Sequence, residues 1–459
     1  MSALWTSGEL AKAIGGTAST EFAVQGVAFD SREVGVGDLF IALKGEATDG
    51  HRFVEGAFGQ GAAGAIVSEP VSGSHILVAD TTAALDALGF AARGRTAARI
   101  AGVTGSVGKT GTKEALAAAL ARANRGGVHR SVKSYNNHTG VPLSLARMPA
   151  DSTFAVFEMG MNHAGEIRAL TKMVRPHVAV ITAIASAHIE HLGSLEAIAD
   201  AKAEVFEGLT PGGTAIIPFD TQFRGRITDA AKAAGVENIL TFGRGEGADV
   251  RPVDVIETAN GTMIMAKLPS AELSFKLAYP GEHWVSNAMA VLAAVQALGG
   301  DLAAAGLALG EMEGLAGRGA RHSIAIPDGG TATLIDESHN ANPASMAATL
   351  SVLATTPATR RIAVLGEMRE LGGDGEALHA SLAEPVIQAG VEFALLVGTG
   401  MTPLAKALEG KCEINHVADA EAALVSLMEV LRDGDTILIK GSNAVGLSQI
   451  VSALVSGRR

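Results

Sequence analysis

Apolar runs and Ala/Leu-rich runs alternate along most of this chain, separated by polar segments that are rich in glycine. Between about residues 95 and 315 they alternate as strands and helices do in a mostly parallel sheet covered on both faces. The apolar runs that predict strands there are residues 99–103, 153–158, 178–184 and 214–218. Apolar positions at helical spacing predict helices at 114–123, 194–208 and 288–298.

One separate pattern precedes this region and another follows it. Residues 23–29 and 39–43 predict strands, and residues 54–61 predict a helix. After about residue 321 predicted strands (331–335, 362–365, 393–397, 436–439) alternate with predicted helices (344–354, 376–389, 403–408, 445–455). The chain is therefore predicted to be an α/β protein of three domains: a small N-terminal α/β domain (1–92), a central P-loop-type domain with a mostly parallel sheet (93–318) and a C-terminal Rossmann-like α/β domain (319–459).

Composition narrows the possible functions. The 459 residues suit about three domains, and 47% hydrophobic with 18% charged residues is typical of a globular chain. No apolar run reaches the length of a membrane span and the first residues do not resemble a leader, so we expect a cytoplasmic protein without a membrane partner. A net charge of -12 argues against nucleic acid as a partner. The single cysteine, Cys412, excludes an internal disulfide and a cysteine-built metal site.

Residues 102–110, Gly-Val-Thr-Gly-Ser-Val-Gly-Lys-Thr, lie between a predicted strand and a predicted helix. Glycines let backbone N–H groups converge, Lys109 neutralises phosphate oxygens, and the Thr110 hydroxyl is able to bind Mg²⁺. The common P-loop pattern places a glycine where this chain has Val103, so the loop is a variant. The segment predicts a nucleoside triphosphate site; the alternative is a glycine-rich turn.

One further residue indicates metal chemistry near this loop, and another is a lysine at an apolar position. Glu158 ends a predicted strand, where a carboxylate would lie near the loop and bind Mg²⁺; the alternative is a solvated turn. Lys202 lies on the apolar face of the predicted helix 194–208, so it either extends to solvent, is modified, or is paired with a strong charge. His188 and His191 lack a third ligand of matching spacing, which disfavours a structural zinc site.

Other polar segments follow predicted strands or open helices. Ser31, Arg32 and His51 come after strands, where they either bind a phosphorylated ligand or form ordinary turns. Residues 136–142 predict a rigid loop whose amides contact phosphate or sugar. Residues 281–287 open an Ala-rich helix, for which Ser286 or Asn287 would be a simple N-cap.

Together these motifs resemble the Mur ligase family of ATP-dependent enzymes that form the amide bonds of the cell-wall peptide. Residues 104–110 are similar to the family's T-G-T-x-G-K-[ST] loop, with Ser106 in place of a threonine. Residues 336–343 (DESHNANP) and 365–372 (LGEMRELG) are similar to D-D-S-Y-N-A-N-P and L-G-D-M-x-E-L-G of the members that add D-alanyl-D-alanine. The resemblance implies a monomeric ligase that uses ATP and Mg²⁺ to join D-alanyl-D-alanine to UDP-N-acetylmuramoyl-tripeptide through an acyl phosphate.

The resemblance also implies roles for single residues. The implied catalytic residues are Lys109, Glu158, His188 and Lys202, the last as a carbamylated lysine, and the implied metal ligands are Thr110, Glu158, His188 and Lys202. ATP would be bound by Gly105, Ser106, Val107, Gly108, Lys109, Thr110, Thr112, Asn287, Arg318, Asp336, Asn340 and Asn342. The N-terminal domain would bind the UDP-sugar, and the implied substrate contacts are Ser31, Arg32, His51 and Asn137.

Three positions depart from the family pattern, and several other functions remain alternatives. Trp284 replaces an amide that contacts adenine in relatives, Asn443 replaces an arginine, and His339 replaces a tyrosine. The alternatives are a sibling ligase that adds a single amino acid, a folylpolyglutamate synthase, a P-loop ATPase that moves a partner, and a nucleotide-sugar-binding protein without catalysis.

Overall fold

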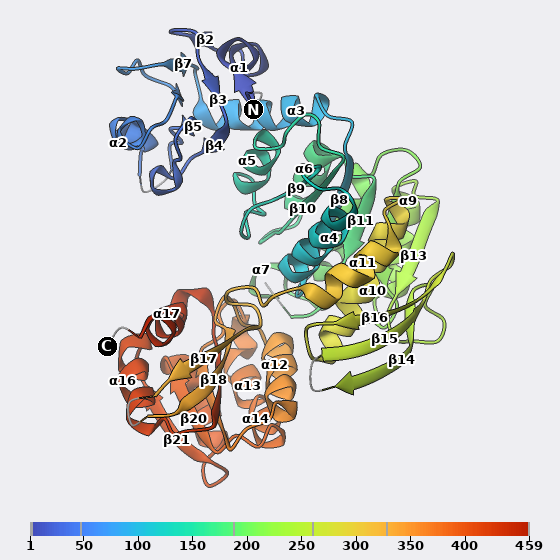
Figure 1. Cartoon of the computed structure of the whole chain (residues 1–459), viewed down its shortest axis with the longest axis vertical. Coiled ribbons are helices and arrows are strands. Elements are labelled where there is room, and N and C mark those ends of the chain that lie inside the picture. The colour runs from blue at the N-terminus through green and yellow to red at the C-terminus, as the bar shows by residue number, and fades with distance from the viewer. Residues whose placement is uncertain (1–2, 46–47, 187–188, 259–260, 327–328, 458–459) are drawn as a thin grey trace.

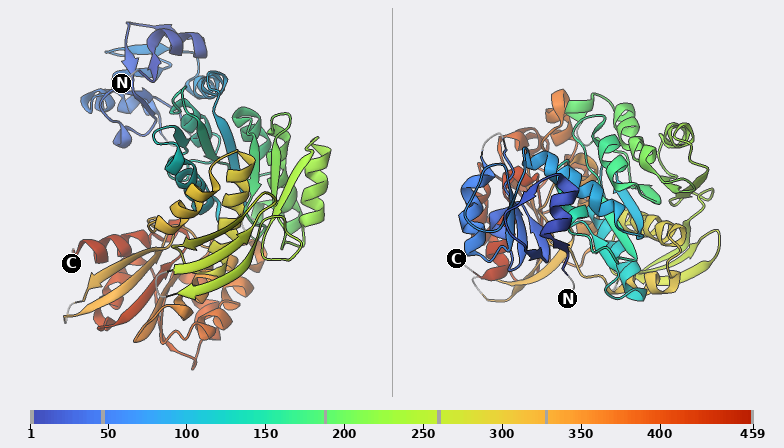
Figure 2. Two further views of the ribbon diagram at one scale, coloured as in Figure 1. Left: turned by 45° about the vertical axis from the view of Figure 1, so that its right-hand side comes forward. Right: turned by 90° about the horizontal axis from the view of Figure 1, so that it is seen from above.

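The computed structural model describes residues 3–45, 48–186, 189–258, 261–326 and 329–457. The chain forms three parts that follow one another in space as they do in sequence, with the N-terminal part at one end and the C-terminal part at the other (Figure 1). Figure 2 shows the same order from a second side, with the central part between the other two. The predicted α/β class with three parts is confirmed.

The N-terminal part contains a sheet in the order β2-β7-β6-β5-β4, in which only β2 runs antiparallel to its neighbour. Short strands β1 and β3 pair beside it. The predicted strand 23–29 is broken into β3 and β4, and helix α3 was not predicted. The elements are β1 (Trp5–Thr6), α1 (Ser7–Ile14), β2 (Thr17–Ala18), β3 (Ala23–Val24), β4 (Gly26–Ala28), β5 (Asp38–Ile41), α2 (Val54–Gly59), β6 (Gly64–Val67), β7 (His75–Leu77) and α3 (Thr81–Gly94).

The central part is built on a parallel sheet in the order β13-β12-β11-β8-β10-β9. The register pairs Glu158 with Val103, so the carboxyl ends of β8 and β10 open at the same edge. Helices α4, α10 and α11 share one buried apolar cluster, and α3, α5 and α6 contribute to another. The elements are β8 (Arg99–Thr104), α4 (Lys109–Ala123), β9 (Val128–Arg130), α5 (Gly140–Ala146), β10 (Phe154–Glu158), α6 (Glu166–Val174), β11 (Val178–Ile181), α7 (Ile189–Leu192), α8 (Leu195–Ala203), β12 (Thr214–Pro218), α9 (Arg224–Ala233), β13 (Asn238–Phe242), α10 (Glu282–Ala297) and α11 (Leu302–Glu311).

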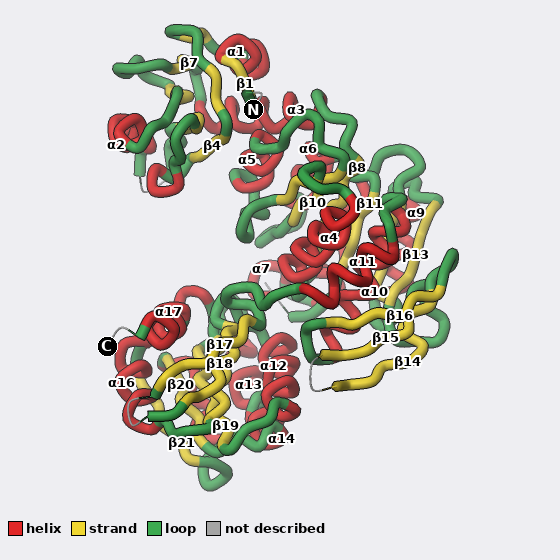
Figure 3. The backbone as a smooth tube through the Cα atoms, viewed as in Figure 1, coloured by secondary structure: helices red, strands yellow, loops and turns green. Residues whose placement is uncertain are grey.

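An antiparallel sheet that was not predicted follows β13. It has the order β14 (Arg251–Thr258), β15 (Gly261–Lys267) and β16 (Glu272–Leu277). The sheet lies beside helices α10 and α11 (Figure 3). Along β15, buried Ile264 and Ala266 alternate with exposed Met263, Met265 and Lys267. This alternation is the usual pattern of a strand with one face packed on a core.

The C-terminal part has a sheet in the order β17-β18-β22-β19-β20-β21, parallel except for edge strand β17. Two apolar clusters cover its faces. The elements are β17 (Ala320–Ala325), β18 (Thr331–Glu337), α12 (Pro343–Thr355), β19 (Arg360–Gly366), α13 (Gly375–Ala380), α14 (Ala383–Gln388), β20 (Phe393–Val397), α15 (Thr402–Ala407), β21 (Glu413–Val417), α16 (Ala420–Val430), β22 (Asp435–Lys440) and α17 (Ser448–Ser456).

Several boundaries differ from those predicted. The predicted helix 194–208 is α8 followed by a 3₁₀ turn (Glu204–Gly208), and 376–389 divides into α13 and α14. Helix α10 begins at Glu282 with Gly281 at its cap, so the N-cap role considered for Ser286 or Asn287 is wrong. The predicted loop 136–142 becomes helical from Gly140 onward. Within the described ranges, no helix has the length and apolar character needed to cross a membrane.

Candidate active site

The loop between β8 and α4 has the strand, loop and helix arrangement that the sequence predicts. Gly105 and Gly108 have φ of 147° and 82°, which other residues rarely adopt. A Cβ atom on Gly105 would overlap the Thr182 hydroxyl, and one on Gly108 would lie 2.9 Å from Asn287 Oδ1. Glycine is therefore required at both positions. The loop ends at the N-terminus of α4, where the helix dipole favours an anion.

Lys109 is the first residue of α4 and lines a cavity at the loop. Its Nζ donates a hydrogen bond to the Gly105 carbonyl oxygen at 2.7 Å. Burial lowers the pKa of Lys109, and the Glu158 carboxylate acts in the opposite direction. A half-buried ammonium within a glycine bend is well placed to neutralise phosphate oxygens.

Glu158 lies at the end of β10 with an exposed fraction of 1%, which contradicts the solvated-turn alternative. Thr110 Oγ1 donates to Glu158 Oε2 at 2.8 Å, and Asn136 Nδ2 donates to Oε1 at 2.7 Å. A hydroxyl and a carboxylate that meet beside the loop are hard oxygen donors of the kind that Mg²⁺ prefers. The residues present therefore fit a magnesium ion.

Lys113 is a buried cation on α4 that sequence reasoning did not single out. Its side chain has no exposed area. Nζ donates to the carbonyl oxygens of Ser131 and Lys133 at 2.8 and 2.7 Å and lies 2.9 Å from Glu114 Oε1. Lys113 therefore anchors the chain segment that follows β9 to the helix of the phosphate loop.

We expect Lys113→Met to destabilise the central part by about 2–5 kcal/mol, because two buried carbonyls and part of a carboxylate lose their partner. Calorimetric unfolding would measure the shift of the central transition. Lys232→Met, at an exposed position on α9, is the matched control and should change the transition little. Equal effects of the two substitutions would contradict the anchoring role of Lys113.

Lys202 faces inward from α8 with an exposed fraction of 1%, so the alternative that it extends to solvent is wrong. Among the described residues, no hydrogen bond or ion pair to the Lys202 ammonium is found. Burial, and secondarily the charge of Lys109, holds the pKa of Lys202 well below its usual value. The predicted neighbour His188 lies outside the described residues.

A cavity of about 720 Å³ joins the phosphate loop to the C-terminal part. Among the predicted nucleotide and substrate residues, those that line it include Asn137, Asn287, Arg318, Asn340 and Asn342. Two others do not. Thr112 is fully buried within α4, and Asp336 accepts hydrogen bonds from the Gly317 N–H at 2.6 Å and the Ser338 hydroxyl at 2.6 Å. Asp336 therefore stabilises the connection between the central and C-terminal parts.

Ser31, Arg32 and His51 lie in the N-terminal part, outside this cavity. The Arg32 guanidinium binds Asp30 while its side chain remains 87% exposed, and this contact lowers the pKa of Asp30 to about 2. His51 Nε2 accepts from the Ser68 N–H at 2.9 Å, which leaves Nδ1 to donate to Asp49 at 2.6 Å. Both segments are 3₁₀ turns capped by an aspartate, as the turn alternative predicted.

Two of the three departures from the family pattern, Trp284 and His339, lie at the cavity. The Trp284 ring stacks on Tyr279, with centroids 4.1 Å apart and 13° between the planes, and forms part of the cavity wall. Burial lowers the pKa of His339 to about 4, so its ring is neutral near pH 7. Ser134 Oγ lies 3.3 Å from His339 Nε2 and accepts from Arg318 Nη2 at 3.1 Å. Sequence reasoning missed Ser134, whose only signal is its place two residues before Asn136.

Comparison with known proteins identifies the family. The Mur ligase middle domain matches residues 103–295, the glutamate ligase domain of Mur ligases matches 324–443, and a further Mur ligase catalytic domain matches 23–124. A Synechocystis protein described as UDP-N-acetylmuramoyl-tripeptide–D-alanyl-D-alanine ligase is 35% identical over 444 residues, which cover 95% of this chain and 93% of the relative. This chain belongs to the Mur ligase family.

Other relatives of this Mur ligase agree with that assignment. The Escherichia coli ligase of the same description is 33% identical over 95% of this chain and 94% of its own. A crystal structure of MurF from Acinetobacter baumannii has a TM-score of 0.83 at 32% identity, covering 98% and 99% of the two chains. MurF from Thermotoga maritima in complex with ADP has a TM-score of 0.76 at 26% identity, covering 94% and 97%. The similarity extends over all three parts of this Mur ligase.

Proposed function

We propose that this Mur ligase joins D-alanyl-D-alanine to UDP-N-acetylmuramoyl-tripeptide with hydrolysis of ATP to ADP and phosphate, giving the UDP-muramoyl-pentapeptide precursor of peptidoglycan. One observation carries the proposal: one cavity brings Lys109, the Thr110–Glu158 pair and Arg318 together with Lys440 of the C-terminal part. Full-length similarity to ligases of that description supports the choice of substrates.

The reaction has two steps. The terminal carboxylate of the tripeptide attacks the γ-phosphorus of ATP, so that ADP leaves and an acyl phosphate forms. The free amine of the dipeptide then attacks the acyl carbon, a proton is lost from the amine, and phosphate leaves. Lys109 and the loop would hold the phosphates in place, and most of the rate enhancement would come from positioning and charge neutralisation.

Thr110 and Glu158 would bind Mg²⁺, with His188 and Lys202 at a second ion. When bound, Mg²⁺ neutralises charge on the phosphoryl group as it is transferred. Because burial lowers its pKa, Lys202 would react as a neutral amine with CO₂, forming an N–C bond and releasing one proton to give a carbamate. That carboxylate would give the lysine the negative charge that metal binding needs.

The remaining roles follow the positions of the residues. Asn287, Arg318, Asn340 and Asn342 line the cavity and would contact the nucleotide, whereas Thr112 and Asp336 would act indirectly through the backbone. Ser31, Arg32 and His51 would bind the uridine diphosphate, and Asn137 would face the peptide. We propose functional domains of 1–92, 93–318 and 319–459, and a cytoplasmic monomer without nucleic acid or membrane partners.

Release of phosphate in a matrix of substrates tests the proposed function. UDP-N-acetylmuramoyl-tripeptide would be offered with D-alanyl-D-alanine, with single amino acids, or with no acceptor. We expect release only with the tripeptide and the dipeptide together, with one amide product formed for each phosphate. Release with a single amino acid would favour a sibling ligase, and release without any acceptor would favour an ATPase of another class.

A further inference from the structure

Residues 131–139, here called the junction loop, connect β9 to α5 and touch all three parts of the molecule. Successive side chains of the loop point to opposite sides. Lys133 and Tyr135 contact Glu33 of the N-terminal part, whereas Ser134 and Asn136 contact the candidate active site.

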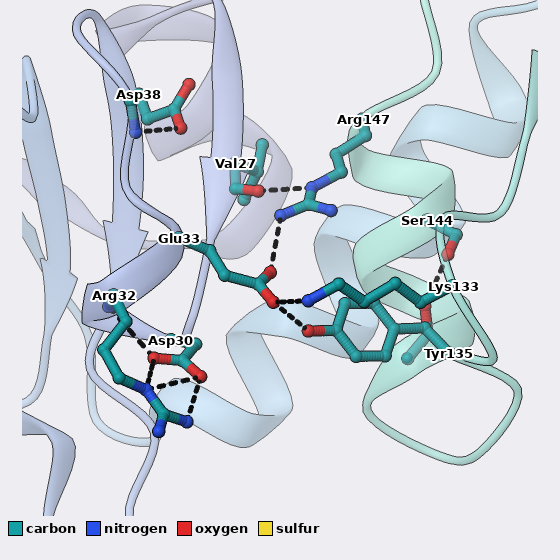
Figure 4. Close-up of polar contacts among 11 residues, drawn as sticks. Val27, Asp30, Arg32, Glu33, Asp38, Lys133, Tyr135, Ser144 and Arg147 are labelled. Carbon is teal, nitrogen blue, oxygen red and sulfur yellow. Dashed lines mark hydrogen bonds and ion pairs between the residues drawn. The ribbon is translucent and has the colours of Figure 1, made fainter. Parts of the chain in front are cut away.

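The contact with the N-terminal part converges on a single carboxylate (Figure 4). Glu33 Oε1 accepts from the Tyr135 hydroxyl at 2.9 Å and from Lys133 Nζ, while Arg147 Nη2 lies 4.0 Å from Oε2. Arg147 Nε also donates to the Val27 carbonyl at 2.5 Å. Burial raises the pKa of Glu33, but these contacts together outweigh burial and hold the pKa below its usual value, so the carboxylate is charged at neutral pH.

Glu33 belongs to the same 3₁₀ turn as Ser31 and Arg32, the residues proposed to bind uridine diphosphate. A ligand held by that turn would therefore act on the carboxylate that binds the junction loop. The turn is a single hydrogen-bonded unit, in which the Glu33 N–H donates to the Asp30 carbonyl at 3.0 Å. Movement of Ser31 or Arg32 thus displaces Glu33 as well.

The other side of the junction loop reaches the phosphate and metal residues. Asn136 Nδ2 donates to Glu158, and Ser134 Oγ lies 3.5 Å from Thr110 Oγ1. Ser134 also receives the hydrogen bond from Arg318 and lies beside His339 of the C-terminal part. A shift of the loop would therefore change the positions of Thr110, Glu158 and Arg318 together.

The backbone of the loop is fixed tightly enough to transmit such a shift. Lys113 holds the carbonyls of Ser131 and Lys133. Lys133 has φ of 52°, a left-handed conformation that costs a non-glycine residue about 1–2 kcal/mol and persists only where surrounding contacts require it. A surface ion pair such as Lys133–Glu33 would by itself contribute only about 0–1 kcal/mol to stability. The contact is therefore better explained as one that positions the junction loop than as one that stabilises the fold.

We infer that Glu33 is a positioning residue that couples binding of the UDP-linked substrate to binding of ATP, acting through Lys133, Tyr135 and the junction loop. This inference rests on the proposed function, because the proposed function assigns the two ligands to the two sides of the junction loop. The coupling is a property of binding and does not require the acceptor dipeptide. It predicts that each ligand increases affinity for the other by the same factor.

The test measures the dissociation constant of β,γ-methylene-ATP with Mg²⁺ by calorimetry, with and without saturating UDP-N-acetylmuramoyl-tripeptide. We expect the tripeptide to tighten nucleotide binding by about 5-fold or more in the unmodified protein. Glu33→Ala should reduce the ratio of the two dissociation constants to below about 2-fold. In the absence of the tripeptide, the variant should bind the nucleotide with nearly the same affinity as the unmodified protein. In turnover, the KM for ATP should rise at saturating tripeptide while kcat changes less.

Two further variants keep the test decisive. Tyr135→Phe removes one hydroxyl and should lower the ratio even if Glu33→Ala folds poorly. Glu311→Gln removes an exposed ion pair with Arg122, away from the junction loop, and should keep the unmodified ratio. A ratio of 1 in the unmodified protein, or an unchanged ratio in both Glu33→Ala and Tyr135→Phe, would overturn the inference. Ligation by the unmodified protein is measured separately. If that protein ligates but gives either of these outcomes, the inference is refuted and the proposed function stands.

Discussion

Lys109→Ala should lower kcat for ATP-dependent ligation by about 10²–10³-fold, the usual cost of losing one preorganised charge or donor that stabilises a transition state. The Lys109 side chain is half-buried in the glycine bend, where its ammonium faces the position proposed for the β- and γ-phosphates. Water would replace the lost ammonium poorly at this position, because electrostatic interactions are stronger where solvent is partly excluded. Steady-state measurement of amide product and phosphate at saturating ATP would give the change.

Two comparison variants test whether the effect depends on the shape of the Lys109 ammonium as well as its charge, and whether loss of any lysine has the same effect. Lys109→Arg keeps the charge but replaces a compact ammonium by a planar fork, and should remain strongly impaired. Lys172→Ala removes an exposed lysine of α6 and should leave turnover unchanged. Near-normal ligation by Lys109→Ala would refute the proposed mechanism.

The residues that the sequence identified best are those whose chemistry is local. The phosphate loop needs a strand, glycines and a helix in immediate succession, and all three are visible within residues 99–123. Glu158 could be placed because a polar residue that ends an apolar strand lies at the edge where ligands bind in parallel sheets. Each of these two predictions depends on residues that are only a few positions apart in the sequence.

The junction loop could not be found in that way, because its partners are distant in sequence. Ser134 is 184 residues from Arg318 and 205 from His339, and Tyr135 is 102 from Glu33. None of these pairs has a periodicity or spacing that a single sequence reveals. The turn at 31–33 was noticed for Ser31 and Arg32, but its third residue makes the contact with the central part.

Other omissions had a signal that went unused. Helix α3 buries Thr81, Ala84, Leu85, Leu88 and Ala92, which follow the spacing of an amphipathic helix, and Asp80 caps it. The sheet β14-β15-β16 shows alternation of buried and exposed side chains along β15. Both patterns depend only on residues that are neighbours in the sequence, so both elements are predictable from it.

Lys202→Ala should reduce ligation by about 10–100-fold, the range seen when a group that supports metal binding is lost. An unmodified lysine amine is mostly protonated at neutral pH and reacts poorly with CO₂. At Lys202, burial lowers the pKa, so a larger share of the amine is neutral and nucleophilic. Removal of bicarbonate from the unmodified protein should therefore also lower activity, and its return should restore it. ¹³C-bicarbonate labelling would give a carbamate signal that disappears in Lys202→Ala.

Rescue experiments separate the carbamate from simple packing. Formate or acetate should partly restore Lys202→Ala, because truncation leaves space for a small carboxylate near the proposed second ion. Lys202→Met fills most of that space with an apolar chain, so it should be equally impaired but resist rescue. Undiminished turnover of either variant, or of bicarbonate-free protein that lacks the ¹³C signal, would refute the carbamate. Full turnover of the bicarbonate-free protein alone would leave Lys202 to act as an unmodified neutral amine, which is compatible with its lowered pKa. Full turnover of Lys202→Ala would mean that ligation does not need Lys202.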